Sequence, residues 1–247
     1  MIISLLKISL WNLNLKILAL ITARKGSKRI PGKNVRSLGD KPLIMWSIET
    51  IQGMPDICDV LVSTDDSAIA DIGRMANVLV PWLRPKELST DEASSVDVCL
   101  HAVNWYESEH DKLDGILLLQ PTSPFRSKNK VHHGINLFRE NNHQLPVIGV
   151  SHATTHPYWC YKDTNGGFKP YIVGGSGYRS QDLPSAYVLN GAFFLISPEN
   201  LRKERTFLSD KMVPLIFDKP EESIDLDTEW DWMIAESFLQ KQNVSSK

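Results

Sequence analysis

The strongest constraint on the fold is a regular alternation of short apolar runs with amphipathic stretches of helix length. Five apolar runs rich in Leu, Ile and Val predict strands at residues 17–22, 60–63, 78–81, 115–120 and 146–150. Several of these runs are continuously apolar, which is typical of parallel strands covered on both faces. Amphipathic stretches predict helices at residues 42–51, 67–75, 93–106 and 129–141. The alternation predicts an α/β fold with a doubly wound, mostly parallel sheet.

The alternation breaks between residues 151 and 184, where the chain is rich in Gly, Tyr, His and Pro and has no helical period. A connection of this length without regular structure is uncommon unless it is functional or bound to a partner. Regular structure is expected again at residues 187–197 and 212–217, followed by a final helix at residues 228–240. One stripe of that helix is apolar, formed by Trp230, Met233, Ile234 and Phe238.

The composition excludes several classes of protein. The 247 residues include 27 Lys and Arg against 29 Asp and Glu, which argues against a general nucleic-acid binder, because such proteins rely on excess positive charge. Cys58, Cys99 and Cys160 form no C-x-x-C pair, which excludes a disulfide framework and a cysteine-built zinc site. We therefore expect a reducing compartment and a cytoplasmic location.

Residues 1–15 form an apolar N-terminal extension that stands apart from the alternation. Lys7, Asn12 and Asn14 interrupt it, so it is a poor match to a membrane span. It also runs directly into the first expected strand, which is atypical of a signal peptide. An extra strand, a leader or an upstream start would each account for it. We expect no membrane partner, one domain over residues 16–240 and a tail at residues 241–247.

The loop at residues 23–34 concentrates positive charge after the first expected strand. Five basic residues lie within ten positions, beside glycines and a serine: Arg24, Lys25, Gly26, Ser27, Lys28, Arg29, Gly32 and Lys33. Glycines let backbone N–H groups approach phosphate oxygens, and Arg and Lys neutralise phosphate charge. A solvated basic turn is the alternative. The loop matches neither the Walker nor the dinucleotide motif, but its place at the carboxyl end of a strand favours phosphate binding.

Asp225 and Asp227 form a carboxylate pair just before the final helix. In an extended segment, residues two apart point to the same side, so Ile224 and Leu226 would face the core and both carboxylates a cleft. Adjacent carboxylates stay ionised best beside a cation, and Mg²⁺ is commonly held by one or two carboxylates plus substrate phosphates. This predicts a metal site for Mg²⁺, with Mn²⁺ as the alternative ion. A helix N-cap at Asp227 is the structural alternative, and both roles could coexist there.

These features belong to an ordered series of motifs that resembles one family. The series comprises A-R-K-G-S-K-R-I-P-G-K-N at 23–34, S-T-D-D at 63–66, L-R-P-K-E-L-S-T-D at 83–91, L-Q-P-T-S-P at 119–124, R-S-Q-D-L-P at 179–184, N-G-A at 190–192 and I-D-L-D-T-E at 224–229. It resembles the acylneuraminate cytidylyltransferases, which are the CMP-sialic acid synthetases and their relatives acting on other nine-carbon keto-sugar acids. The resemblance extends from about residue 16 to residue 238. It implies a Rossmann-like nucleotidyltransferase fold of three α/β/α layers, with a small protruding dimerisation segment at 151–185.

The resemblance assigns the basic loop to the triphosphate of CTP. It implies nucleotide contacts from the loop residues Ala23, Arg24, Gly26, Ser27, Lys28, Lys33 and Asn34. Fixed cations placed where charge develops on the leaving pyrophosphate lower the barrier to displacement. The expected catalytic residues are Arg24, Lys28, Asp225 and Asp227.

The resemblance also implies that Arg84, Ser94 and Ser95 recognise the base and ribose. The structural alternative for the hydroxyls of Ser94 and Ser95 is helix capping, by Thr90 or Asp91, before the helix expected at residue 93.

The sugar acid is assigned by the resemblance to two further segments. Gln120 and Ser123 are implied to contact it, although Pro121 and Pro124 alone could shape a turn there. Further substrate contacts are implied for Arg179, Gln181 and Asn190, and the guanidinium of Arg179 suits the sugar carboxylate. The family places the segment of Arg179 at a homodimer interface, where it completes the neighbour's pocket and where Tyr158, Trp159 and Tyr171 would be anchors. A loop held on its own subunit is the alternative.

The expected reaction is transfer of CMP from CTP to a nine-carbon 2-keto sugar acid of sialic, legionaminic or pseudaminic type. The anomeric hydroxyl attacks the α-phosphorus in line, and pyrophosphate leaves. An eight-carbon acid such as 3-deoxy-manno-octulosonate, another nucleotide such as GTP, or a catalytically silent nucleotide-binding protein are the alternatives. The chain departs from the family in residues 1–15 and at Lys25, where many relatives have glycine.

Overall fold

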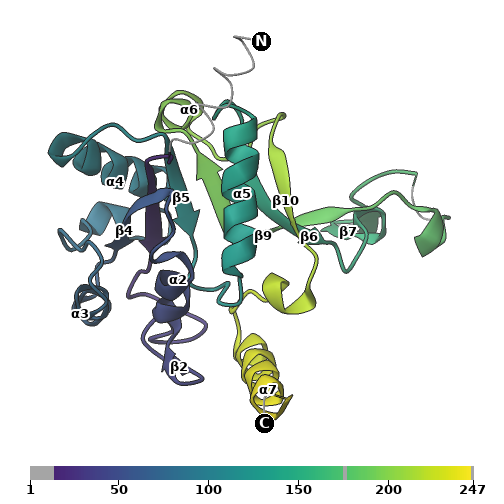
Figure 1. Cartoon of the computed structure of the whole chain (residues 1–247). Helices are drawn as coiled ribbons and strands as arrows, with labels where there is room; N and C mark the ends of the chain where they lie inside the picture. The colour runs from purple at the N-terminus through teal and green to yellow at the C-terminus, as the bar shows by residue number, and fades with distance from the viewer. Residues whose placement is uncertain (1–13, 175–176, 246–247) are drawn as a thin grey trace.

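The computed structural model describes residues 14–174 and 177–245. At its centre is a six-stranded sheet in the order β10-β6-β9-β5-β1-β4 (Figure 1). Its strands are β1 (Ile17–Thr22), β4 (Ile57–Ser63), β5 (Gly115–Leu119), β6 (Val147–His152), β9 (Tyr187–Ile196) and β10 (Val213–Phe217). The pairs are parallel except where β9 runs antiparallel to both β5 and β6. The prediction of a mostly parallel sheet is therefore confirmed.

Helices cover both faces of the sheet, and β1 shows why its sequence is continuously apolar. Ile17, Ala19 and Ile21 pack in one buried cluster with side chains of α2 (Leu43–Ile51), α3 (Ser67–Met75) and α5 (Lys128–Glu140). Leu18 and Leu20 pack on the opposite face with α4 (Ser95–Glu109) and α6 (Pro198–Glu204). Every residue of β1 from Ile17 to Ile21 is fully buried. The three-layer α/β/α architecture is therefore the one predicted.

The regular elements differ from the expected ones at two places, an expected strand that is absent and a helix that no pattern predicted. Residues 78–81 form no strand; Leu79 alone makes a parallel bridge to Leu61. Asn77 precedes it at a φ of 55°, and Pro81 has no N–H to donate, so the pairing cannot extend. The short helix α6 was not predicted, although Ser197 caps it and Pro198 occupies its first turn.

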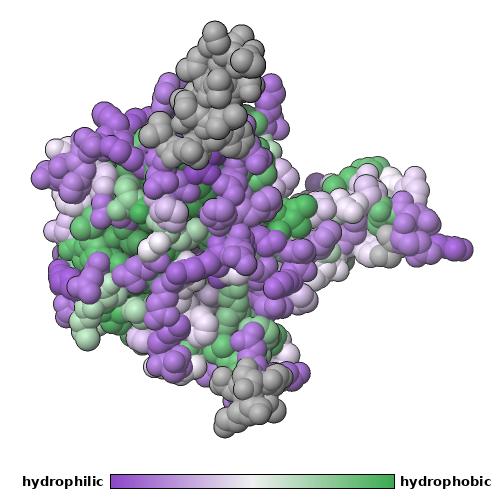
Figure 2. Space-filling model, in the orientation of Figure 1, coloured by the Kyte–Doolittle hydropathy of each residue, from purple (hydrophilic) through white to green (hydrophobic). Residues whose placement is uncertain are grey.

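The segment expected to lack regular structure contains a small hairpin. Strands β7 (Tyr161–Thr164) and β8 (Gly167–Pro170) pair antiparallel, flanked by the 3₁₀ turns η2 (Pro157–Trp159) and η3 (Ser180–Asp182). The Asn165-Gly166 dipeptide between the strands is a strong hairpin signal in the sequence, although here the positive φ, of 108°, falls on the following Gly167. We call the segment between β6 and β9, residues 153–186, the arm. It projects sideways from the body (Figure 1), and Figure 2 shows apolar residues on its surface.

The C-terminal helix α7 (Glu229–Ser245) lies below the sheet and extends into the stretch expected to be a tail. Its buried side is formed by Trp232 and Ala235, which pack with Ile30 and Leu38. Three residues of the stripe expected from the sequence face outward instead, because Trp230, Met233 and Ile234 are exposed. The fourth, Phe238, is partly buried, and its ring centre lies 5.0 Å from that of Phe125. Arg36 fastens the start of the helix, since it pairs with Glu229 at 2.7 Å and lies 4.2 Å from the ring centre of Trp232.

The remaining elements are short. They are β2 (Ser37–Leu38) with β3 (Lys41–Pro42), and the 3₁₀ turns η1 (Lys86–Leu88) and η4 (Pro220–Ser223). Residues 1–13 of the N-terminal extension lie outside the described part of the chain, and the backbone N–H of Leu15 donates to Asp56 Oδ1 at 2.9 Å. Within the described ranges, no helix is long and apolar enough to cross a membrane.

Candidate active site

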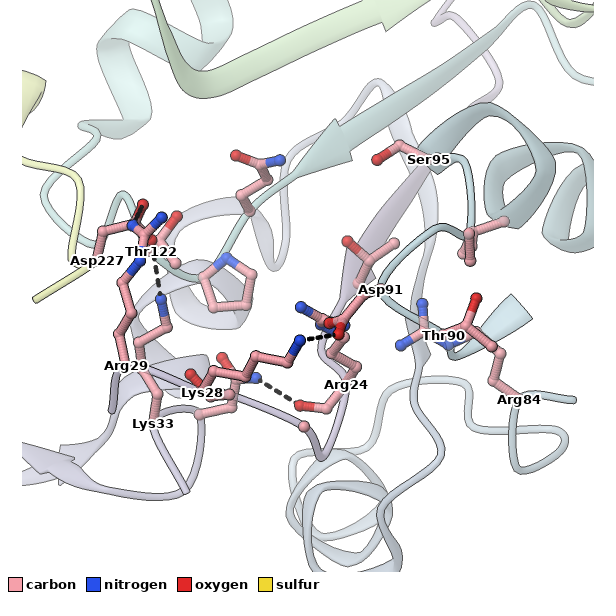
Figure 3. Close-up of a pocket in the computed structure, with 18 of the residues that line it drawn as sticks. Arg24, Lys28, Arg29, Lys33, Arg84, Thr90, Asp91, Ser95, Thr122 and Asp227 are labelled. Atoms are coloured by element: carbon pink, nitrogen blue, oxygen red, sulfur yellow. Dashed lines mark hydrogen bonds and ion pairs between the residues drawn. The ribbon is translucent and has the colours of Figure 1, made fainter. Parts of the chain in front are cut away.

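A cavity of about 560 Å³ opens at the carboxyl ends of β1 and β5. Its lining joins segments that are far apart in the sequence: Thr22, Arg24, Gly26, Ser27, Lys28, Arg29, Lys33, Asn34, Arg84, Leu88, Thr90, Asp91, Ala93, Ser95, Val98, Gln120, Pro121, Thr122, Asp225 and Asp227. In Figure 3, Asp227, Arg29 and Thr122 lie at one end and Arg84, Thr90 and Ser95 at the other. The basic loop and the carboxylate pair therefore share one cavity, at the edge where α/β sheets bind ligands.

Arg24 and Lys28 project from the loop after β1 and meet at Asp91. Both cations form ion pairs with that carboxylate, one with each oxygen (Figure 3). The Lys28 ammonium and the Arg24 guanidinium together hold the pKa of Asp91 below its usual range. Asn34 braces the loop, because its Nδ2 donates to the carbonyl of Arg24 at 3.3 Å. Two cations are thus directed at the centre of the cavity.

A second cationic group surrounds Asp227. Arg29 Nη1 lies 2.6 Å from Oδ2, and Lys33 Nζ lies 3.4 Å from Oδ1 and 2.6 Å from the carbonyl of Leu226. Asp227 is not the helix cap that was the alternative for it. Thr228 and Asp231 form that cap, since Asp231 Oδ2 accepts from the N–H of Thr228 at 2.7 Å and Thr228 Oγ1 accepts from the N–H of Asp231 at 3.3 Å.

Asp225 is the carboxylate of the pair that has no ion-pair partner among the described residues. Burial raises its pKa above the usual range, the nearby charge of Asp227 adds to the rise, and a hydrogen bond with Thr122 opposes it. The main chain fixes its position, because the N–H of Leu226 donates to the carbonyl of Thr122 at 2.8 Å. A carboxylate without an ion-pair partner, open to solvent at the cavity and beside a second carboxylate, fits a hard cation with oxygen ligands.

Arg84 is buried at the opposite end of the cavity with unused hydrogen-bond donors. Its backbone N–H donates to the carbonyl of Thr64 at 2.7 Å, but Nε and Nη2 have no partner in the described structure. Burial lowers the pKa of this guanidinium. Because buried donors without acceptors are rare in native proteins, the donors of Arg84 are suited to a ligand acceptor.

Most of the residues predicted to bind the nucleotide line the cavity, but fewer of those predicted to bind the sugar acid do. Ala23 is buried and absent from the lining. Ser94 caps α4 by accepting from the N–H of Val96, while Ser95 lines the cavity. The capping alternative thus applies to Ser94 itself, and Thr90 and Asp91 line the cavity instead.

The sugar residues divide into three groups. Gln120 lines the cavity. Ser123 and Asn190 are buried just outside the lining and bonded together, since Ser123 Oγ donates to the carbonyl of Asn190 at 3.2 Å. Arg179 and Gln181 are exposed on the arm and do not line the cavity of their own chain.

Sequence reasoning missed several lining residues, most notably Arg29, Asp91 and Thr122. Arg29 was counted in the basic loop without a role, and Asp91 was considered only as a helix cap. Thr122 lies between the two prolines of L-Q-P-T-S-P and carries no charge. A charge-balance argument could have found Asp91, since a cluster of cations requires nearby carboxylates.

Comparisons with known proteins agree with this geometry. The family model described as Cytidylyltransferase matches residues 18–159. The chain belongs to the cytidylyltransferase family. It is 34% identical over 230 residues to CMP-N,N'-diacetyllegionaminic acid synthase of Legionella pneumophila, an alignment that covers 92% of this chain and 97% of that protein. It is 32% identical to N-acylneuraminate cytidylyltransferase of Streptococcus agalactiae, where the match covers 89% of this chain but 52% of the relative.

A solved structure supports the fold of this cytidylyltransferase independently. The CMP:2-keto-3-deoxy-manno-octonic acid synthetase complexed with CTP matches with a TM-score of 0.68 at 16% identity, over 92% of this chain and 99% of that one. The sequence relatives and the family model make this chain a nucleotidyltransferase of the acylneuraminate cytidylyltransferase type.

Proposed function

We propose that this cytidylyltransferase activates a nine-carbon 2-keto sugar acid with CTP and releases pyrophosphate. The observation that carries the proposal is the shared cavity, in which Arg24 and Lys28 lie between the carboxylate pair and the buried Arg84. A triphosphate needs several cations along its length, while a nucleoside needs directed donors at one end. The sequence relatives support the nine-carbon class, because two of them are named for such acids.

The cavity residues have different proposed roles in binding and in catalysis. Arg24 and Lys28 bind the phosphates and stabilise the charge that develops on the departing pyrophosphate, since fixed cations need no reorganisation during reaction. Lys33 and Asn34 are largely buried and brace this loop. Arg84 and Ser95 bind the nucleoside end, and Gln120 binds the sugar acid.

Asp225 and Asp227 are the residues that would hold Mg²⁺, with Mn²⁺ as the alternative ion. A cation held there would supply positive charge against the phosphates of the substrate. Among the described residues, no cluster of three or more His, Cys, Asp or Glu side chains could form a protein-only metal site. Two carboxylates completed by phosphate oxygens are the arrangement that Mg²⁺ commonly adopts.

The arm is proposed to complete the sugar site of a second copy in a homodimer. Arg179 and Gln181 lie outside the cavity of their own chain, so they reach a sugar acid only by docking elsewhere. Phe168, Tyr171 and Val173 expose apolar side chains on the same segment. Exposed aromatic residues of this kind are typical anchors of protein interfaces.

The test is a pyrophosphate-release assay with purified protein, Mg²⁺, a panel of nucleotides and a panel of keto acids. CTP with a nine-carbon acid of the legionaminic or sialic type is expected to give the highest kcat/KM. Preference for an eight-carbon acid or for GTP would replace the proposed substrates. Absence of turnover with every pair, while CTP still binds, would favour the catalytically silent alternative.

A further inference from the structure

Strand β9 contains an irregularity directly behind the cavity. Its register against β6 shifts, because Ile148 pairs with Phe194 whereas Val150 pairs with Leu189. On β6, one residue, Gly149, lies between these two pairs, whereas on β9 residues 190–193 lie between them. Gly191 sits in this bulge at a φ of +70°, a conformation that residues with a side chain rarely adopt. β9 lies between β6 and β5 (Figure 1), so the bulge adjoins the strand that leads into Gln120.

Gly149 leaves the space that Asn190 fills. A Cβ at position 149 would lie 2.6 Å from Asn190 Oδ1 and 3.1 Å from the backbone nitrogen of Phe193. In that space, Asn190 Oδ1 accepts from the N–H of Ala192 at 3.1 Å, and Nδ2 donates to Ser151 Oγ at 3.0 Å. The buried Asn190 therefore braces the bulge, and the conformation of Gly191 is fixed on both sides.

Gly191 in turn leaves the space that Gln120 fills. A Cβ at position 191 would lie 2.4 Å from Gln120 Oε1 and 3.7 Å from Ser123 Oγ. The contact involves the far end of the glutamine side chain, so the glutamine and not the backbone would have to move. No hydrogen bond of the Gln120 carboxamide to another described residue is present, and Gln120 lines the cavity. Its direction is thus determined by the shape of the bulge.

We propose that Gly191 is a positioning residue for the sugar-acid site, because its missing side chain sets where the Gln120 carboxamide lies at the cavity wall. The inference rests on the proposed function in one respect, the contact between Gln120 and the sugar acid. Gly191 touches no substrate itself. The residue pair 120 and 191 would then determine affinity for the keto acid while leaving the nucleotide end of the cavity unchanged.

The first experiment compares Gly191→Ala with Gly53→Ala. Gly53 also has a positive φ, of +75°, but a Cβ there meets nothing within 4 Å, so it controls for backbone strain alone. Both variants are expected to melt at lower temperature than wild type. Only Gly191→Ala should raise KM for the keto acid, by about 10- to 100-fold as expected for a misplaced contact, with KM for CTP within twofold of wild type. Equal KM values for the keto acid in both variants would overturn the proposal.

A double variant separates positioning from general damage. In Gln120→Ala the side chain that the new methyl group would displace is gone, so adding Gly191→Ala should not raise KM for the keto acid further. An additive increase would show that Gly191→Ala acts through something other than Gln120, against the proposal.

A crystal structure of Gly191→Ala gives a readout that needs no turnover. The Gln120 carboxamide is expected to leave its wild-type position, and an unmoved carboxamide would refute the inference. This result stands even if the wild-type protein activates no keto acid in the panel, in which case the proposed function alone fails.

Discussion

At the residue scale, the cavity is built from charges that are only partly neutralised by the protein. Asp227 is shared by Arg29 and Lys33, and Asp91 by Arg24 and Lys28, whereas Asp225 has no ion-pair partner in the described structure. A cluster of opposite charges in which one carboxylate lacks an ion-pair partner and has a raised pKa is typical of a functional site.

Asp225→Asn is expected to remove most Mg²⁺-dependent turnover without lowering stability at neutral pH. The pKa of Asp225 is raised in the folded protein, so the ionised form is disfavoured by folding. Wild type is therefore destabilised above the folded pKa, and asparagine removes that cost there; the difference vanishes below the unfolded pKa, about 3.9. Urea unfolding of both proteins between about pH 3 and about pH 8, a range that extends below the unfolded pKa, measures this difference in stability. Near-wild-type turnover would reject the metal assignment.

Lys28→Ala is expected to lower kcat for pyrophosphate release by about 10²- to 10³-fold, because it removes a cation that is proposed to stabilise the leaving group. Lys25→Ala is the matched control, since Lys25 carries the same charge in the same loop but does not line the cavity. Steady-state kinetics at saturating CTP distinguishes the two variants. Equal effects at both positions would mean that only the overall charge of the loop matters.

At the scale of elements, α7 positions the carboxylates through its cap. Thr228→Ala removes the Oγ1 that accepts from the N–H of Asp231, and loss of such a cap typically costs about 1 kcal/mol. Urea unfolding is expected to show a loss of that size. Thr154→Ala, at an exposed site in the loop after β6, is the control and should change stability little. A cost equal to that of the control would exclude the capping role.

Elements with a strong apolar pattern could be predicted from the sequence, and those governed by geometry could not. Continuous burial in β1 and the amphipathic faces of α3 and α5 leave a clear signal in the residues. The prediction for α7 was wrong for Trp230 and Met233, because Trp232 and Ala235 make the buried contacts that an apolar count assigns to those two residues. The β9 bulge gave no signal beyond N-G-A, since its shape depends on the facing Gly149.

The candidate site shows the same division. The basic loop and Asp225-x-Asp227 were predicted from charge and spacing, and both line the cavity. The ion pairs of Arg24 and Lys28 with Asp91 were not predicted. Asp91 lies 67 positions after Arg24 and 63 positions after Lys28, so only folding brings these residues together. The roles of all these residues remain predictions to be tested by the variants above.

At the scale of the whole molecule, one chain separates its predicted substrate residues between body and arm. The cavity holds Gln120, whereas Arg179 and Gln181 are exposed on a projecting segment (Figure 1). A protein that exposes Phe168, Tyr171 and Val173 on such a segment has an apolar surface suited to a partner.

Mixing two inactive variants tests whether that partner is a second copy. Arg179→Ala and Asp225→Asn are each expected to be inactive as homodimers. After the two proteins are mixed and allowed to exchange subunits, half of the dimers are mixed and each has one intact site, so activity should return to about a quarter of wild type. Pyrophosphate release measures the recovery. Persistent inactivity after demonstrated exchange would place Arg179 at the cavity of its own chain or outside the site.

The pairing of Arg24 and Lys28 with Asp91 has a consequence for how any anion enters the cavity. An incoming phosphate must compete with the carboxylate of Asp91, which already pairs with Arg24 and Lys28. The affinity for the phosphate therefore reflects an exchange of counter-ions and not the full attraction of two unpaired cations. A single weak anion such as chloride is expected to gain little from that exchange, whereas the proposed triphosphate would also extend to Lys33 and Arg29 in the same cavity. We therefore expect Asp91 to act as an internal competitor that favours polyphosphates over small anions.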